Sequence, residues 1–282
     1  MHYQNADAPA GPRVLASLAA GEPVLSLGVR AARTSDVARM ASGAGYHVIW
    51  IDLEHSTMSV DCAAQIAASA TDLGLAAWVR VPEREYGVIG RLLDGGATGI
   101  ISPKVETAEE ARLVAAACRF PPQGQRSAIA LLPQTGFVRE PAVELTSKSN
   151  AGVIVQVLLE SARGIINVDE IAAVEGVDLL GVGMNDLSAD LGCPGDLRNP
   201  KLAAACAQIA AAAARHGKTA VVGGVADASH FLEFLGMGFA PLIFAGIDTD
   251  VLAAGLVQRV ADWRGRFPKP VGAGPDLQST RT

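Results

Sequence analysis

The sequence predicts a (β/α)8 TIM barrel, and two observations carry that prediction. Short apolar runs rich in β-branched residues alternate with longer Ala-rich stretches of helical period, the pattern of a parallel sheet covered by helices. This alternation occurs eight times within about 250 residues, the count and size of such a barrel. No Gly-x-Gly-x-x-Gly motif follows the first run, which disfavours a doubly wound nucleotide-binding sheet.

The eight apolar runs are expected to be strands, because buried parallel strands read as nearly continuous hydrophobic sequence. In chain order they are residues 24–29, 47–53, 76–81, 98–103, 152–159, 177–183, 218–223 and 240–245.

A helix candidate follows each strand, and several carry their own end signals. Thr107 with Glu109 and Glu110 places a capping oxygen and acids where the first helical amides need them, and Gly74 lies just past a helical run. The expected helices are residues 35–44, 59–73, 86–93, 108–119, 164–173, 200–216, 228–235 and 248–264.

Residues 119–150 interrupt this rhythm between the fourth helix and the fifth strand. Long connections in compact domains are usually functional or mobile, so we expect an excursion near the active face of the barrel. Residues 267–282 contain prolines, glycines and polar side chains, and we expect a disordered tail there. The chain is thus predicted to be one barrel domain, residues 1–266, followed by this tail.

The composition excludes several classes of protein. With 50% hydrophobic and 18% charged residues, the chain can bury a large core. A formal charge of −6 without a basic cluster argues against a nucleic-acid partner, and no apolar stretch is long enough to span a membrane. Four scattered cysteines suggest neither a disulfide framework nor a zinc site. We therefore expect a cytoplasmic protein that acts on small molecules.

Two carboxylates fall at the carboxyl ends of neighbouring predicted strands, where barrel active sites form. Glu160 closes the fifth strand and Asp186 follows the sixth. Without a nearby His or Cys ligand, such a pair suits a hard divalent ion, Mg2+ or Mn2+, rather than zinc. The alternative is structural: Asp186 caps a short helix begun by Leu187 and Ser188, and Glu160 pairs with Arg163.

A histidine and an arginine are predicted at the same end of the barrel, the mouth formed by the carboxyl ends of the strands. His55 lies three residues after Asp52, close enough for the carboxylate to orient the imidazole as a general base. Arg80 ends the third strand and could hold an oxyanion. Alternatively His55 is structural, and Arg80 forms a salt bridge with Glu54 or Glu83. A metal, a base and an arginine together favour chemistry through an enolate.

Lys104 follows the fourth strand. A lysine there could form a Schiff base, but metal-binding carboxylates make that chemistry redundant. We interpret Lys104 as a solvated lysine at the rim of the barrel.

Several segments resemble the sequence signature of the HpcH/HpaI aldolase family, the metal-dependent class II pyruvate aldolases. They span roughly residues 15–260, in order and at compatible spacing, and are residues 49–55, 79–82, 92–97, 103–111, 119–126 and 176–192. The resemblance implies a barrel, usually a hexamer built from two trimers, that cleaves 4-hydroxy-2-oxo acids to pyruvate and an aldehyde.

The resemblance also implies roles for individual residues. Glu160 and Asp186 match the metal ligands, which take Mg2+ or Mn2+, with Co2+ as a further candidate. His55 matches the base, acting with Asp52, and Arg80 the group that stabilises the pyruvate enolate.

Two further positions take roles from the same resemblance. Asp94 matches a residue that raises the basicity of the histidine, in some members from a neighbouring subunit. The backbone amides of Asn185 and Asp186 would hold the carboxylate of the 2-oxo acid.

The chain departs from the family pattern at several positions. Leu158 stands where the family usually has a glutamine that contacts the oxo acid, and residues 83–87 replace a usual Trp-Asn-Asp-Pro. Removing a buried polar group typically costs about 1 to 3 kcal/mol if its partner stays unpaired. The donor is therefore either not plain pyruvate, or another residue such as Gln134 in the long connection supplies the missing hydrogen bond.

The predicted function is that of a divalent-metal aldolase. It would act through a metal-bound enolate on a small 2-oxo acid and an aldehyde, as a homotrimer or homohexamer. Alternatives are an oxo-acid decarboxylase or an acyl-CoA lyase with the same site, and a barrel that binds ligands without catalysis.

Overall fold

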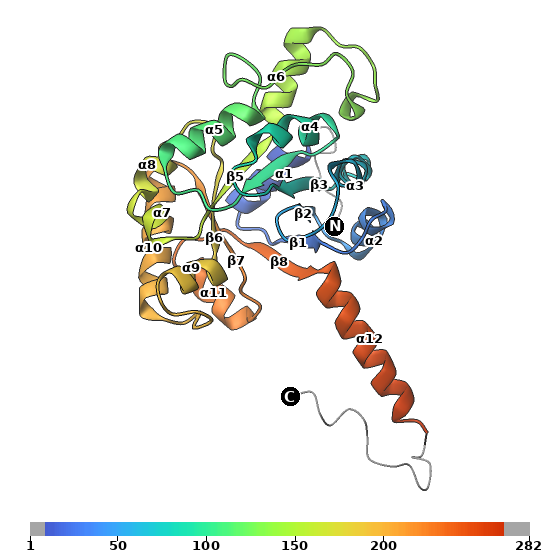
Figure 1. Cartoon of the computed structure of the whole chain (residues 1–282), viewed down its shortest axis with the longest axis vertical. Coiled ribbons are helices and arrows are strands. Elements are labelled where there is room, and N and C mark those ends of the chain that lie inside the picture. The colour runs from blue at the N-terminus through green and yellow to red at the C-terminus, as the bar shows by residue number, and fades with distance from the viewer. Residues whose placement is uncertain (1–8, 268–282) are drawn as a thin grey trace.

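The computed structural model describes residues 9–267, so the expected tail at 267–282 lies outside the described residues apart from Phe267. Eight parallel strands form one sheet in the order β7-β6-β5-β4-β3-β2-β1-β8, and the N–H of Ala240 donates to the C=O of Ala220 across the remaining seam. The prediction of a (β/α)8 barrel is confirmed (Figure 1). The strands are β1 Val24–Val29, β2 Val48–Asp52, β3 Ala76–Arg80, β4 Gly99–Ser102, β5 Ile154–Leu159, β6 Leu179–Gly183, β7 Thr219–Gly223 and β8 Leu242–Ile247.

Helices surround the sheet, and all eight predicted helical regions contain helix. The fifth region divides into two short helices at Asn167, and the third begins with a 3-10 turn. The elements are α1 Ala10–Ala19, α2 Asp36–Ala44, α3 Val60–Asp72, η1 Tyr86–Val88, α4 Ile89–Asp94, α5 Ala108–Cys118, η2 Pro133–Thr135, α6 Ala142–Gly152, α7 Ala162–Ile166, α8 Val168–Ala172, α9 Met184–Asp190, α10 Pro200–Arg215, α11 Ala228–Gly236 and α12 Asp248–Arg264.

The local end signals act as the sequence predicts. The Thr107 hydroxyl accepts from the N–H of Glu110, whose carboxylate accepts from the N–H of Thr107, so a reciprocal capping box fixes the start of α5. Gly74 follows the end of α3 at φ +79°, a conformation that glycine adopts without steric cost.

Large side chains fill the inside of the barrel below its mouth. Trp50 and Trp78 lie in register on β2 and β3 and are buried. Their indoles pack against Gly28 and Gly99, where any side chain would overlap the rings. Leu158 belongs to the same buried cluster, so the interior is a packed core and the chemistry is confined to the carboxyl ends of the strands.

The amino end of the barrel differs from the sequence prediction. Residues 119–150 connect the end of α5 to the start of β5, and they therefore lie at the end opposite the mouth, not near the active face. Their helix α6 stands away from the barrel at the top of Figure 1. The sequence analysis also missed α1, whose Val14 and Leu18 pack into the core cluster of the barrel interior.

The last helix, α12, leaves the barrel after β8 and extends away from it at the lower right of Figure 1. None of its residues, all of which the structure describes, is buried. Its exposed apolar side chains are Val251, Leu252, Leu256, Val257, Val260 and Trp263. Within residues 9–267, no helix combines the length and the apolarity that crossing a bilayer requires.

We predict that Gly99→Ala destabilises the barrel by about 1–3 kcal/mol, because the added methyl group overlaps the Trp78 indole. Gly43→Ala in α2 is the matched control, since its methyl group meets nothing within 4 Å and should add up to about 1 kcal/mol through helix propensity. Urea denaturation would measure both changes. Equal midpoints for the two variants would contradict this account of the interior packing.

Candidate active site

A buried carboxylate–arginine pair joins the ends of β2 and β3. Asp52 and Arg80 are the last residues of these strands and lie opposite each other in register. Arg80 Nε donates to Asp52 Oδ1 at 3.0 Å, and Nη2 donates to Oδ2 at 2.7 Å. Arg80 Nη1 also lies 3.1 Å from a carboxylate oxygen of Glu54. The arginine is therefore held in one orientation at the mouth.

Arg30 is a third member of this group, and the sequence analysis did not find it. Its Nε donates to Asp52 Oδ2 at 2.6 Å, so Asp52 lies between two guanidinium groups. Burial alone would raise the pKa of Asp52, but hydrogen bonds and charge from Arg80, and then the bond from Arg30, lower it to about 2. Arg30 directly follows the first strand, so the rule that selected Arg80 would have selected it as well.

His55 lies beside Glu54 rather than in contact with Asp52 through its ring. The imidazole Nε2 is 3.6 Å from Glu54 Oε2, and the side chain is 53% exposed. Asp52 Oδ1 instead accepts hydrogen bonds from the backbone N–H groups of Glu54 and His55 at 3.1 and 3.2 Å. Asp52 therefore shapes the loop that carries the histidine, and the expected ring contact is made by Glu54.

Glu160 is a buried carboxylate without a cationic partner in its hydrogen bonds. The backbone N–H of Lys104 donates to Glu160 Oε2 at 2.9 Å. Burial raises the pKa of Glu160 to about 7 against that bond, and the negative charges of Glu54 and Asp186 add to the increase. The alternative partner Arg163 instead lies 3.6 Å from Glu106.

This carboxylate environment fits a divalent cation. Glu160 directly follows β5, and Asp186 lies in the first turn of α9, which follows the adjacent strand β6. A cation between them would offset the burial of one charge and the repulsion of the other. The described residues contain no group of three or more His, Cys, Asp or Glu side chains arranged to hold a metal. Two carboxylates suit Mg2+ or Mn2+, which keep water and substrate oxygens as their other ligands.

Gly183 makes room for Glu160. A Cβ at residue 183 would overlap the Glu160 carboxylate, so only glycine allows that carboxylate its observed position. The following helix α9 begins at Met184, has no side-chain cap, and carries Asn185 in its first turn. Asp186 lies in the same first turn, so both residues whose amides the family resemblance assigns to the oxo-acid carboxylate stand at the start of α9.

Two predicted residues lie away from this mouth. Asp94 ends α4, at the amino end of the barrel, and accepts a 2.7 Å hydrogen bond from Nη2 of buried Arg126. Gln134 donates to the C=O of Leu93 at the same end. Within the described chain, neither residue lies with His55. Gln134 therefore does not take the place of the glutamine that the family usually has where this chain has Leu158.

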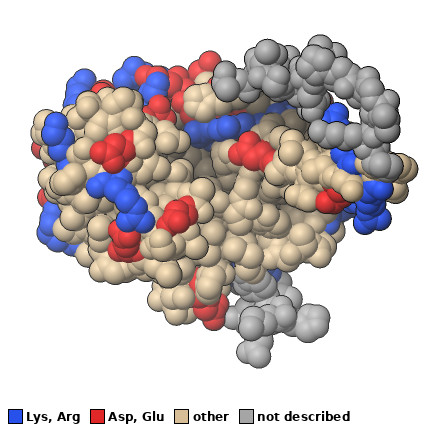
Figure 2. All heavy atoms as spheres, turned by 90° about the horizontal axis from the view of Figure 1, so that it is seen from below, with Lys and Arg blue, Asp and Glu red and all other residues tan. Residues whose placement is uncertain are grey.

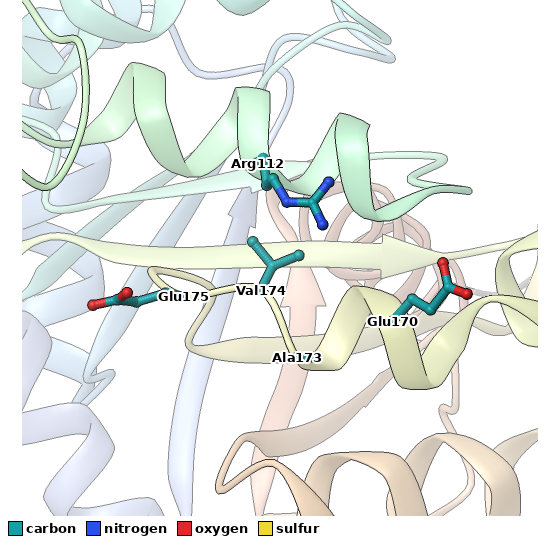
Figure 3. Close-up of a pocket in the computed structure, with 5 residues that line it drawn as sticks. All are labelled: Arg112, Glu170, Ala173, Val174 and Glu175. Carbon is teal, nitrogen blue, oxygen red and sulfur yellow. The ribbon is translucent and has the colours of Figure 1, made fainter.

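The hollow in Figure 3 lies between α5 and the end of α8, with Arg112 and Glu170 among its lining residues and none of the mouth residues. Figure 2 shows acidic and basic side chains interspersed among uncharged ones on one face, without an extended basic patch.

A family model described as HpcH/HpaI aldolase/citrate lyase matches residues 30–252. The chain belongs to the HpcH/HpaI aldolase/citrate lyase family. The family match confirms the resemblance seen in the sequence motifs, and this HpcH/HpaI protein is a lyase of the aldolase type. Divalent-metal dependence is a property of the family, and the carboxylate pair at the mouth agrees with it.

Two curated relatives are similar over most of their length. A 4-hydroxy-4-methyl-2-oxoglutarate aldolase of Hapsidospora irregularis is 38% identical over 251 residues, which are 87% of this chain and 92% of the relative. A 5-keto-4-deoxy-D-glucarate aldolase of Klebsiella pneumoniae is 35% identical over 221 residues, 78% of this chain and 84% of the relative.

Solved structures show the same fold. The HpcH/HpaI aldolase from Desulfitobacterium hafniense aligns with a TM-score of 0.83 at 26% identity, covering 91% of this chain and 98% of that one. An HpcH/HpaI aldolase/citrate lyase family protein from Burkholderia cenocepacia aligns with a TM-score of 0.78 at 30% identity, covering 89% and 98%.

We predict that Asp52→Asn lowers the free energy of unfolding by about 3–5 kcal/mol at neutral pH, because Arg80 loses its main counter-charge while remaining buried. The pKa of Asp52 falls from 3.8 to about 2 on folding, so its contribution is present above pH 3.8 and is lost as the pH falls through about 2. Denaturation of both proteins at several pH values would measure this. A wild-type stability that falls no more steeply than that of the variant below pH 3.8 would contradict it.

Proposed function

We propose that this enzyme cleaves a 4-hydroxy-2-oxo acid to pyruvate, or a related 2-oxo acid, and an aldehyde, with Mg2+ or Mn2+ held by Glu160 and Asp186. Co2+ is a further candidate. When bound, the cation would supply Lewis-acid stabilisation to the oxygens of the oxo acid. The observation that carries the proposal is the convergence of Arg80, the Glu54–His55 pair and buried Glu160 at one mouth.

The residues of the mouth divide the work of the reaction. His55 accepts the proton of the 4-hydroxyl group, the bond between C3 and C4 breaks, and the C4 fragment leaves as the aldehyde. The electron pair moves to the oxygen at C2, where Arg80 stabilises the developing enolate charge. His55 then returns its proton to C3, which gives the 2-oxo acid, whose carboxylate lies against the amides of Asn185 and Asp186.

The geometry supports these roles in specific ways. Asp52 accepts hydrogen bonds from one edge of the Arg80 guanidinium, and Glu54 forms an ion pair with another nitrogen of the same group. The arginine is therefore oriented before the substrate binds. His55 is half-exposed and can reach a ligand at the mouth. The relatives named above are aldolases that act on oxo acids, which supports a substrate of this class.

The first test is exchange of the methyl protons of pyruvate for deuterium, followed by NMR, which reports enolate formation without any aldehyde. We expect metal-dependent exchange in the native enzyme and a loss of about a hundredfold or more in His55→Ala, because the base is removed. Arg80→Ala should also lose exchange. Glu140→Gln, remote from the mouth, is the matched surface control and should exchange normally.

Glu160→Gln tests the metal site in the same assay. The variant should lose exchange, and metal should no longer raise its unfolding temperature. The metal-free variant should unfold no earlier than the metal-free native enzyme, because the amide removes a buried charge that the neighbouring carboxylates disfavour. Full exchange after chelation, or in His55→Ala, would overturn the proposed mechanism.

We also propose that the chain works as a homo-oligomer, a trimer or a hexamer, with α12 packed on a second copy. In a (β/α)8 barrel the helix after the last strand normally covers the outside of the sheet, but α12 is exposed along its length and β8 stays half-buried beyond Leu242. The α12 of a second copy has the length and apolar residues to cover this gap. Asp94, at the far end of its own barrel, could then assist a histidine only in another copy.

Substitution of Val257 by Asp tests this assembly, because Val257 is exposed in the single chain and a charge there should harm only a packed interface. Sedimentation equilibrium should show a trimer or hexamer for the native protein and smaller species for Val257→Asp. Gln258→Asn, on the same helix, is the polar control. A native protein that sediments as a monomer would contradict the proposal.

The cysteines bear on the compartment. All four, Cys62, Cys118, Cys193 and Cys206, are free thiols in the structure. Chains that work in reducing compartments keep their thiols in this state. We propose the cytoplasm as the place of action on this ground.

A further inference from the structure

Lys104 is built into the mouth through its backbone. It follows β4, and its N–H donates to the buried carboxylate of Glu160 at 2.9 Å. Its φ of +48° is a left-handed conformation that residues other than glycine rarely adopt. The backbone is therefore strained at Lys104, next to the Glu160 carboxylate. Strained backbone positions of this kind concentrate at functional sites.

The ammonium group of Lys104 forms one long, solvent-exposed ion pair. It lies 3.4 Å from Glu83 Oε2, and the two side chains are 48% and 35% exposed. An exposed ion pair of this kind contributes little to stability, so a ligand carboxylate can replace Glu83 at little cost. The charge of Lys104 also interacts with Glu54 and Asp186, which places the ammonium within electrostatic reach of the reacting centre.

The arginines around the mouth are bound more firmly. Arg80 is held by Asp52 and Glu54, and Arg30 donates to Asp52 at 2.6 Å. Arg84 lies 2.8 Å from Glu83 and 3.2 Å from Glu110. Compared with these three, Lys104 has the longer single contact and a flexible four-carbon side chain.

Arg163 and Arg33 are the remaining rivals. Arg163 lies on α7, and its guanidinium is 3.6 Å from Glu106 in the loop before α5. Arg33 lies in the loop after β1. Its guanidinium donates to the carbonyls of Arg30 and Ala32 in its own loop, and one nitrogen lies 3.4 Å from the hydroxyl of Thr57. These contacts hold it on the β1 and β2 loops. None of these contacts is with Glu160, whereas the backbone N–H of Lys104 donates a hydrogen bond to Glu160.

We infer that Lys104 binds a second carboxylate of the substrate, carried by the fragment that leaves as the aldehyde. The first carboxylate and the 2-oxo group belong to the half of the substrate that Arg80 and the α9 amides hold in the proposed function, on which this inference rests. The remaining half must extend toward the rim, where Glu83 would repel an anion unless Lys104 turned to meet it. Lys104 thus selects dianionic 4-hydroxy-2-oxo acids over monoanionic ones.

The test uses the metal-loaded full chain in the direction of aldol addition, with pyruvate as donor. Succinic semialdehyde and butanal are the two acceptors, because they share a four-carbon chain and differ in the terminal carboxylate. In Lys104→Gln we expect kcat/KM for succinic semialdehyde to fall by about tenfold or more, mainly through KM, from the loss of one charge-assisted hydrogen bond. The value for butanal should change by less than about twofold.

Three variants sharpen the result. Lys104→Arg keeps the charge and should retain most of the preference for the charged acceptor. Lys148→Gln removes a lysine that also pairs with one glutamate, Glu140 at 3.0 Å, but on α6 at the far end of the barrel, and should change neither acceptor. A selective loss in Arg33→Gln, with Lys104→Gln unchanged, would assign the carboxylate to Arg33 and overturn the inference.

Deuterium exchange into pyruvate separates the two levels of failure. If Lys104→Gln exchanges pyruvate protons and adds butanal like the native enzyme, yet loses nothing with succinic semialdehyde, the inference fails and the proposed function stands. If the native enzyme catalyses neither exchange nor addition, the proposed function fails and the inference with it.

Discussion

The bidentate bond between Arg80 and Asp52 is the interaction on which the mouth of this barrel depends. The two residues end adjacent strands in register, so the ladder between β2 and β3 sets their separation before any side chain is placed. Arg30, which directly follows β1, donates a further hydrogen bond to Asp52, and the backbone amides of Glu54 and His55 donate to its Oδ1. One buried carboxylate thereby orients the proposed oxyanion-binding arginine and also folds the loop that presents the histidine.

On the other side of the mouth, Glu160 is a buried carboxylate without the arginine partners that Asp52 has. Glu160 accepts a hydrogen bond from the backbone N–H of Lys104 but faces the negative charges of Glu54 and Asp186. A cation bound beside it would stabilise this buried carboxylate. Gly183 leaves the space in which that carboxylate lies. The mouth of the barrel therefore places a charge-balanced ion pair, Asp52 with Arg80, beside a carboxylate whose hydrogen bond comes from a neutral backbone donor. In the proposed function, that asymmetry prepares one side to hold substrate charge and the other to hold a cation.

The packed interior explains why this chemistry stays at one end. Trp50 and Trp78 fill the barrel against glycines on neighbouring strands, and Leu158 belongs to the same cluster close below Glu160. An apolar residue therefore lies below the site, at the position where the family resemblance leads us to expect a glutamine. At the other end of the barrel, Asp94 and Arg126 form an ion pair that takes no part in this chain's own mouth.

The sequence by itself determined the barrel, the order of its eight strands with the helix that follows each, and most of the residues at the mouth, because hydrophobic period and end-of-strand position are local properties of the chain. Asp52, His55, Arg80, Glu160 and Asp186 could be selected in this way, and Arg30 was available to the same rule. Only the tertiary structure decided which groups touch: that Glu54 rather than Asp52 lies beside the imidazole, that Asp94 and residues 119–150 lie at the far end, and that α12 leaves its own barrel. These outcomes depend on packing between distant segments, which no local pattern encodes.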